Sequence, residues 1–290
     1  MKKILTTFAA FAFVLAMNAQ VEKNVIFRVA TGNISYTEPV HKKETVGSVL
    51  GSLLTAAAGS NTQNHPEFAD EVRTAIVGGV GAARRLNVID GLFQPGEIGE
   101  NESAMYIDGN IASITTTSQT KETTDNKGKK HTTIQYRANI NVAVNLKDAK
   151  SDAIIRTFNF NSGDYSYSWI ESPQKAIGNA ISHIKSRLTS ALNSMYPLYA
   201  QIIEGNSAKK DKQKEVYIDL GGKDGVYNGM HFYVYSVKTI AGKEAKTEIG
   251  RIKITEVQGD DVSLCKVTKG GADIKTSIDA GAKLLIMSRD

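Results

Sequence analysis

IQYRANINVAVNL, residues 134–146, alternates apolar side chains with mostly polar ones. Successive side chains of a strand point to opposite faces, so this pattern predicts a strand with one face against a core and the other toward water. Residues 105–114 have the composition of a partner strand, and the turn sequence Asp125-Asn126-Lys127-Gly128 lies between the two. We therefore expect a long hairpin.

Two amphipathic helices are predicted, one on each side of this hairpin in the sequence. Pro66 stands in the first turn of the earlier helix, where apolar residues recur at every fourth position. Ser172 caps the later helix and Pro173 takes its first position. The apolar stripe of the later helix is Ile177, Ile181, Ile184, Leu188, Ala191, Leu192 and Met195. Strands interleaved with helices indicate an α+β domain, a mixed sheet with packed helices, over residues 21–200.

A change of composition separates this domain from a second one. Residues 201–215 include EGNSAKKDKQKE, which has four lysines and no apolar residue larger than alanine, and they are predicted to form a solvated linker. Residues 216–290 hold five short strand-like segments with turn residues between them, which is typical of a small all-β (SH3-like) barrel. One segment contains Cys265, the single cysteine. We interpret it as a small buried apolar residue rather than a reactive thiol.

The beginning of the chain is typical of a signal peptide. Lys2 and Lys3 precede an apolar run, and Ala19 offers a small residue at which a signal peptidase could cut. Residues 1–20 are therefore predicted to direct export, and we expect the chain in the periplasm or at the outer membrane. No cysteine stands directly after the expected cut, so no lipid anchor is expected. The alternative is a cytoplasmic chain with an apolar N-terminus. No apolar stretch reaches the ~18 residues of a membrane-spanning helix.

No sequence pattern points to a catalytic, cofactor or metal site, so we expect a protein that is not an enzyme and holds no cofactor. The five histidines are scattered, with no pair three or four residues apart. The glycines of residues 78–81 fall within a predicted helix rather than between a strand and a helix. A net charge of +5 over 290 residues is too small to predict a nucleic-acid partner. An enzyme acting on cell-wall or phosphate substrates remains an alternative, which would need carboxylates or histidines converging in a cleft.

One aromatic cluster is a candidate partner-binding site. Its members are Phe158, Phe160, Tyr165, Tyr167 and Trp169, which alternate with mostly small polar residues around the turn sequence of residues 161–164. A paired hairpin would place all five side chains on one side of the sheet. That side could bind a partner protein or a glycan, or it could pack on the later helix as part of the core. Composition does not choose between these two interpretations.

The order of these segments also supports a family resemblance. The segments that carry it are residues 25–30, 84–90, 106–111, 140–148 and 195–197. Through them, residues 21–200 resemble the periplasmic domain family of the curli-secretion channel protein, which the lipoprotein activator of penicillin-binding proteins shares. Residues 216–226 and 229–235 are similar to the C-terminal barrel of flagellar assembly protein T. The resemblance implies domains that bind envelope proteins and that carry no catalytic residues.

The hairpin departs from the curli channel. Residues 115–124, TTTSQTKETT, offer no apolar residue to face lipid, whereas a membrane-inserted strand needs an alternating apolar band. We therefore expect a non-enzymatic periplasmic adaptor or assembly factor that binds envelope proteins at the outer membrane or cell wall. The alternative is an oligomeric subunit of an outer-membrane secretion pore related to the curli channel.

Overall fold

The computed structural model describes residues 24–37, 61–89, 91–94, 96–100, 102–164 and 168–289. The chain divides into two compact units. Ile26–Tyr196 forms the first unit, and Pro197–Asp290 forms the second, to which Asn24 and Val25 also belong. The predicted signal peptide, residues 1–20, lies outside the described residues.

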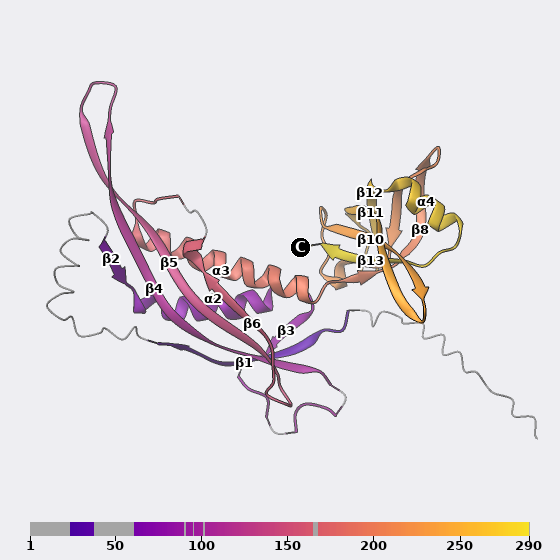
Figure 1. The fold of residues 1–290 in the computed structure, drawn as a ribbon, viewed down its shortest axis with the longest axis horizontal. Coiled ribbons are helices and arrows are strands. Elements are labelled where there is room, and N and C mark those ends of the chain that lie inside the picture. Colours follow the sequence, from indigo (N-terminus) through magenta and orange to yellow (C-terminus); the bar gives the residue numbers. More distant parts are fainter. Residues whose placement is uncertain are drawn as a thin grey trace, which may run out of the picture. The chain divides into compact units, whose positions relative to one another are not determined.

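The first unit is built on a mixed sheet (Figure 1). Its strands are β1 (Phe27–Tyr36), β2 (Asn61–Asn64), β3 (Leu86–Ile89), β4 (Ala104–Thr124), β5 (Lys130–Asp148) and β6 (Ile154–Asn161). The strand order is β3-β1-β4-β5-β6, and β2 pairs with the outer part of β4. Strand β1 runs parallel to β3 and β4, whereas β4, β5 and β6 are antiparallel neighbours.

The predicted long hairpin is confirmed as β4 and β5. The two strands pair from Met105 opposite Asp148 to Thr124 opposite Lys130, with a bulge between Ile111 and Ser113. The expected alternation also holds, because Ile140, Val142, Val144 and Leu146 are all buried. Residues 119–135 form an arm that extends past the helices (Figure 1). Its one large apolar side chain, Ile134, is 54% exposed.

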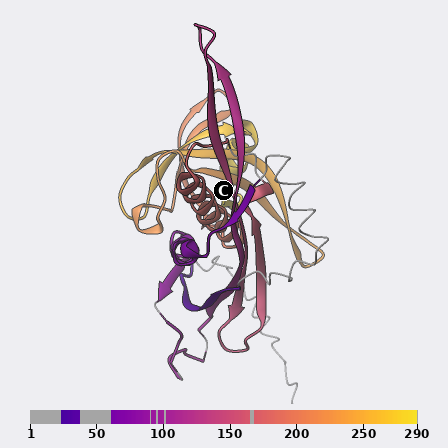
Figure 2. The same ribbon diagram turned by 90° about the vertical axis from the view of Figure 1, so that its left-hand side faces the viewer.

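Two helices pack against the same face of this sheet, as Figure 2 shows. Helix α2 (Ala69–Gly81) follows the 3-10 turn η1 (Pro66–Phe68), and α3 (Pro173–Met195) follows Ser172. The Ser172 hydroxyl accepts a hydrogen bond from the Lys175 backbone N–H at 3.3 Å, which is the predicted cap. The core between helices and sheet includes Val72, Ile76, Val80, Ile111, Ile140, Val144, Ile177, Ile184 and Leu188. The helices contact each other where Thr189 donates to the Gly79 carbonyl at 2.8 Å.

The second unit is a seven-stranded antiparallel sheet that curls on itself (Figure 1). Its strands are β7 (Tyr199–Ala200), β8 (Ile202–Lys209), β9 (Lys212–Ile218), β10 (His231–Ile240), β11 (Lys243–Val257), β12 (Ser263–Lys269) and β13 (Leu284–Arg289). The order is β7-β13-β10-β11-β12-β9-β8, with the 3-10 turn η3 (Gly222–Asp224) before β10 and helix α4 (Gly271–Asp279) before β13. Together the two units confirm the predicted α+β class.

Cys265 is buried, as its interpretation as a small apolar core residue predicts. The side chain lies in the core of the second unit with Phe232 and Ile252. Burial raises the pKa of its thiol to about 12, because a thiolate is poorly solvated in apolar surroundings. The thiol is therefore protonated at neutral pH and inert as a nucleophile.

The prediction that residues 201–215 form a solvated linker is wrong, because most of these residues belong to the hairpin of β8 and β9. Its lysines are outward-facing or turn residues, and Lys210 adopts a left-handed backbone with φ of 56°. Gln213 is buried, and its side-chain amide donates to the Ser207 carbonyl at 3.0 Å and to the Glu215 carbonyl at 2.7 Å. The boundary between the units accordingly falls at Pro197. Helix α4 escaped prediction because Ile274 is its only buried residue.

Candidate partner-binding face

The sheet of the first unit has one face under the helices and an opposite face, which we call the open face. Even-numbered residues of β5, from Ala138 to Leu146, point to the core. Odd-numbered residues therefore point to the open face, and so do their cross-strand partners on β4 and β6. These side chains include Asp108 and Asn110 of β4, Arg137, Asn139, Asn141, Asn145 and Lys147 of β5, and Thr157, Asn159 and Asn161 of β6.

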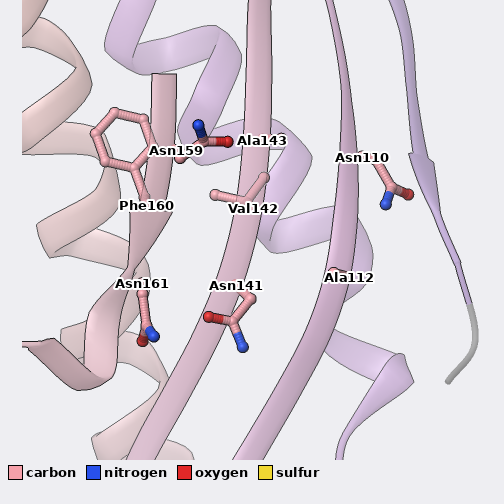
Figure 3. A pocket seen from close by; sticks show the side chains of 8 residues that line it. All are labelled: Asn110, Ala112, Asn141, Val142, Ala143, Asn159, Phe160 and Asn161. Atoms are coloured by element: carbon pink, nitrogen blue, oxygen red, sulfur yellow. The ribbon is translucent and has the colours of Figure 1, made fainter. Parts of the chain in front are cut away.

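Asparagine amides surround a shallow hollow on this face, which we call the amide hollow. Its volume is about 320 Å³. The lining residues are Asn110, Ala112, Asn141, Val142, Ala143, Asn159, Phe160 and Asn161 (Figure 3). Ala112 and Ala143 leave space because their side chains are single methyl groups. The four asparagines supply both hydrogen-bond donors and acceptors without net charge.

A row of hydrogen bonds fixes the polar side chains at one end of the open face. Thr157 Oγ1 donates to Asn145 Oδ1 at 2.8 Å, and Asn145 Nδ2 donates to Asp108 Oδ1 at 2.8 Å. Lys147 Nζ lies 2.8 Å from the other carboxylate oxygen of Asp108, and the positive charge of Lys147 therefore compensates the negative charge of Asp108. The row crosses β6, β5 and β4 and holds their side chains in fixed orientations.

A second row supports the hollow itself. Asn141 Nδ2 donates to Ser113 Oγ at 2.8 Å, and Asn110 Oδ1 accepts from Thr37 Oγ1 at 2.6 Å. Asn161 Oδ1 accepts from the Gly163 backbone N–H at 2.8 Å. These bonds engage one end of three of the four amides, and fixed amides lose little side-chain entropy when a ligand binds.

The turn between β5 and β6 keeps the two strands in this register. The Asp148 carboxylate accepts from Ser151 Oγ at 2.7 Å and from the backbone N–H groups of Ser151 at 2.8 Å and Lys150 at 3.1 Å. These bonds hold the pKa of Asp148 below its usual range, because they favour the ionised carboxylate. The bond from the Ser151 side chain makes the largest contribution. The Asp148 carboxylate is therefore ionised at neutral pH, which is the form that accepts these hydrogen bonds.

At the other end of the open face, Arg137 covers Trp169. The guanidinium carbon lies 4.6 Å from the centre of the indole ring, within range of a cation–π interaction. Ile170 forms an antiparallel bridge with Tyr136, which packs against the core. Trp169 therefore faces the opposite side, where it is half-buried. Trp and Arg are the residue types that most often dominate the binding energy of protein interfaces.

The structure separates the residues of the predicted aromatic cluster. Phe158 is 8% exposed and lies in the core, and Phe160 packs against the same core with its ring 6.4 Å from that of Phe158. Both therefore follow the core interpretation. Trp169 lies on the open face, and its role in partner binding stays a prediction. Tyr165 and Tyr167 lie outside the described residues.

Sequence reasoning missed the four asparagines of the amide hollow. Their signal was present, because asparagine recurs at alternate positions 139 and 141 of β5 and 159 and 161 of β6. The alternation identified these positions as polar, yet it did not show that β4 would add Asn110 beside them. No group of three or more histidine, cysteine, aspartate or glutamate side chains in the described ranges is arranged to hold a metal ion. None of the helices in those ranges is both long and apolar enough to cross a membrane.

Comparisons with known proteins find few similarities to this chain. No protein-family model matches the chain, and no curated protein matches it. One similar solved structure is described as that of a neuraminyllactose-binding hemagglutinin homolog from Helicobacter pylori. It shares 14% sequence identity over 60% of this chain and 91% of its own, with a TM-score of 0.29. Similarity at this level supports no argument about fold or function.

Proposed function

We propose that the protein is a non-enzymatic adaptor or assembly factor of the cell envelope, and that it binds an envelope protein through the open face of its first unit. The observation that carries the proposal is the amide hollow. Four asparagine side chains on three adjacent strands present neutral donors and acceptors around a floor of alanine methyl groups. Such groups match the peptide N–H and C=O groups of another chain.

The chemistry of the open face supports binding rather than catalysis. Asparagine amides do not titrate near neutral pH, so they hold a ligand without transferring protons. The one carboxylate of the fixed row, Asp108, is paired with Lys147 at 2.8 Å. Farther along the open face, Arg137 and Trp169 offer side chains of the types expected at the centre of a protein interface. The envelope location rests on the predicted signal peptide and on the family resemblance.

Site-specific photo-crosslinking in cells tests the proposal. A photoreactive amino acid replaces Asn159, an exposed residue of the amide hollow, and the matched control replaces Asn179, an exposed asparagine of α3. We expect Asn159 to give a crosslink to one defined envelope protein and Asn179 to give none to that protein. Identical products from both positions, or no product from Asn159, would contradict the proposal. A product containing only further copies of this chain would favour the alternative, a subunit of an outer-membrane secretion pore.

A further inference from the structure

The second unit carries a basic and aromatic surface on the outer side of its sheet. Phe232, Val234 and Ile252 point into the core, so the residues between them point outward. We define the basic face as Tyr233 and Tyr235 of β10, Arg251 and Lys253 of β11, and Met287 and Arg289 of β13. In the register of the sheet, Tyr233 lies between Arg251 on one side and Met287 on the other.

Two guanidinium groups contact the central tyrosine. The Arg251 guanidinium carbon lies 5.1 Å from the centre of the Tyr233 ring, and that of Arg289 lies 5.8 Å from it. The Tyr235 ring is 6.2 Å from Tyr233 at an angle of 48°. The tyrosines therefore hold the arginines in place, and an ordered guanidinium loses less entropy when it pairs with a carboxylate.

Further cations extend the positive charge beyond this centre. Lys269 lies opposite Arg251, and Lys266 lies opposite Lys253 across β11 and β12. The acids are fewer: Glu248 accepts from Arg251 Nε at 2.8 Å, and Glu215 lies opposite Lys266. The pKa of Glu248 is lowered, first by its bond to Arg251 and further by the charges of Arg251, Lys269 and Arg289. The one acid near the centre thus lies in a positive potential.

The centre of the basic face is apolar rather than uniformly charged. Met287 is half-buried beside Tyr233, and Leu285, which is 6% exposed, lies opposite Tyr235. An apolar and aromatic centre within a charged rim is the usual anatomy of a protein interface. Stacked nucleic-acid bases fit less well, because they need free ring faces and guanidinium groups already contact the Tyr233 ring.

We propose that the basic face binds an acidic segment of a partner protein. Charge complementarity selects this occupant, because a carboxylate-rich chain can pair with Arg251, Lys253 and Arg289 while its apolar groups contact the tyrosines. The inference rests on the proposed adaptor function and gives the adaptor a second contact surface. This surface lies on the second unit, whereas the amide hollow lies on the first.

Fluorescence anisotropy with labelled poly-L-glutamate tests the inference on the full chain. We expect binding that weakens about tenfold in the R251E/R289E variant, since each exposed charge pair contributes modestly and the variant removes two of them. The K253E/K266E variant changes one cation of the basic face and the cation opposite it on β12 without touching the tyrosine contacts, and we expect a similar loss. The matched control is K209E/K243E, which makes the same change of net charge at exposed positions outside the basic face.

Each outcome decides the matter. Loss of binding in both face variants, with retention in the control, supports the inference. Equal loss in all three variants shows that only net charge matters and overturns it, as does an absence of poly-L-glutamate binding by the unchanged protein. Competition by alginate or by oligothymidine more effective than that by unlabelled poly-L-glutamate would assign the face to an acidic glycan or a nucleic acid instead. None of these results changes the Asn159 crosslink, which tests the adaptor function separately.

Discussion

The two sheets of this protein expose different chemistry. In the first unit, the open face offers uncharged amides around a hollow. Its Asp108 and Lys147 are paired with each other, and its Arg137 lies over the Trp169 ring. In the second unit, the basic face has cations in excess around two tyrosines. Amides select a ligand by the direction of hydrogen bonds, whereas charges act at longer range and are screened by salt. The comparison teaches that one chain can combine a specific contact with an electrostatic one.

The largest effect is expected from the core that supports the open face. Replacing Ile140, which is 0% exposed, with alanine should lower the free energy of unfolding by about 2 to 5 kcal/mol, because it leaves a cavity under the sheet. Its neighbour Asn141 points to the open face and donates one bond, so Asn141→Ala should cost about 0.5 to 1.5 kcal/mol. Denaturant unfolding followed by Trp169 fluorescence measures both. Equal losses would contradict the assignment of the two faces.

A close approach between β4 and β5 gives the next effect. A Cβ atom added at Gly109 would lie 2.5 Å from the Ala143 carbonyl oxygen, next to the amide hollow. Gly109→Ala should therefore destabilise the first unit by about 1 to 3 kcal/mol, as overpacking does. Gly178→Ala, on an open surface of α3, is the control and should stabilise by up to ~1 kcal/mol. A neutral Gly109→Ala variant in the same unfolding assay would mean that the strands can separate freely there.

Salt should distinguish the two surfaces. Raising the ionic strength screens exposed charges, so poly-L-glutamate binding to the basic face should weaken steeply in anisotropy titrations. The yield of the Asn159 crosslink, measured in envelope preparations at the same salt concentrations, should change little because the amides are neutral. Parallel decreases in both readouts would show that the open face also works by charge.

The smallest effect concerns the acid of the basic face. Because the folded-state pKa of Glu248 is depressed below its ordinary value of 4.5, its pairing contributes stability above that value, and this contribution is lost as pH falls through the folded pKa. Carboxyl NMR titration should show Arg251→Gln raising the pKa of Glu248 more than Arg289→Gln does. The reverse order would mean that Arg251 is not its main partner.

Local sequence patterns predicted individual strands and helices of the fold. The alternation from Ala138 to Leu146 identified β5 and its buried face, and Ser172 identified the start of α3. Residues 161–164 suggested a tight hairpin, but Ser162–Asp164 forms a 3-10 turn, and Ile170 forms a bridge with Tyr136 of β5. Trp169 therefore lies on the other face from Phe158, which no repeat in the sequence encodes.

The two surfaces could not be predicted because each combines distant strands. Asn110 and Asn159 line the same hollow only because β4 and β6 both pair with β5. The bulge in β4 that brings Ala112 to the hollow is not marked by any local sequence pattern. Tyr233, Arg251 and Arg289 likewise come from three strands whose mutual register could not be read from any local sequence pattern. The overall charge of +5 gave no indication that cations would gather on one face.

The most direct test of the account is a quantitative pulldown of the tagged chain from envelope extracts, with the captured protein identified through the Asn159 crosslink. Asn159→Asp places a charge in the amide hollow, Trp169→Ala removes the indole at the end of the open face, and Asn179→Asp adds the same charge on α3. The account predicts that the first two variants lose the captured protein while Asn179→Asp retains it. Capture at the same level by all three would contradict the open face as the binding surface.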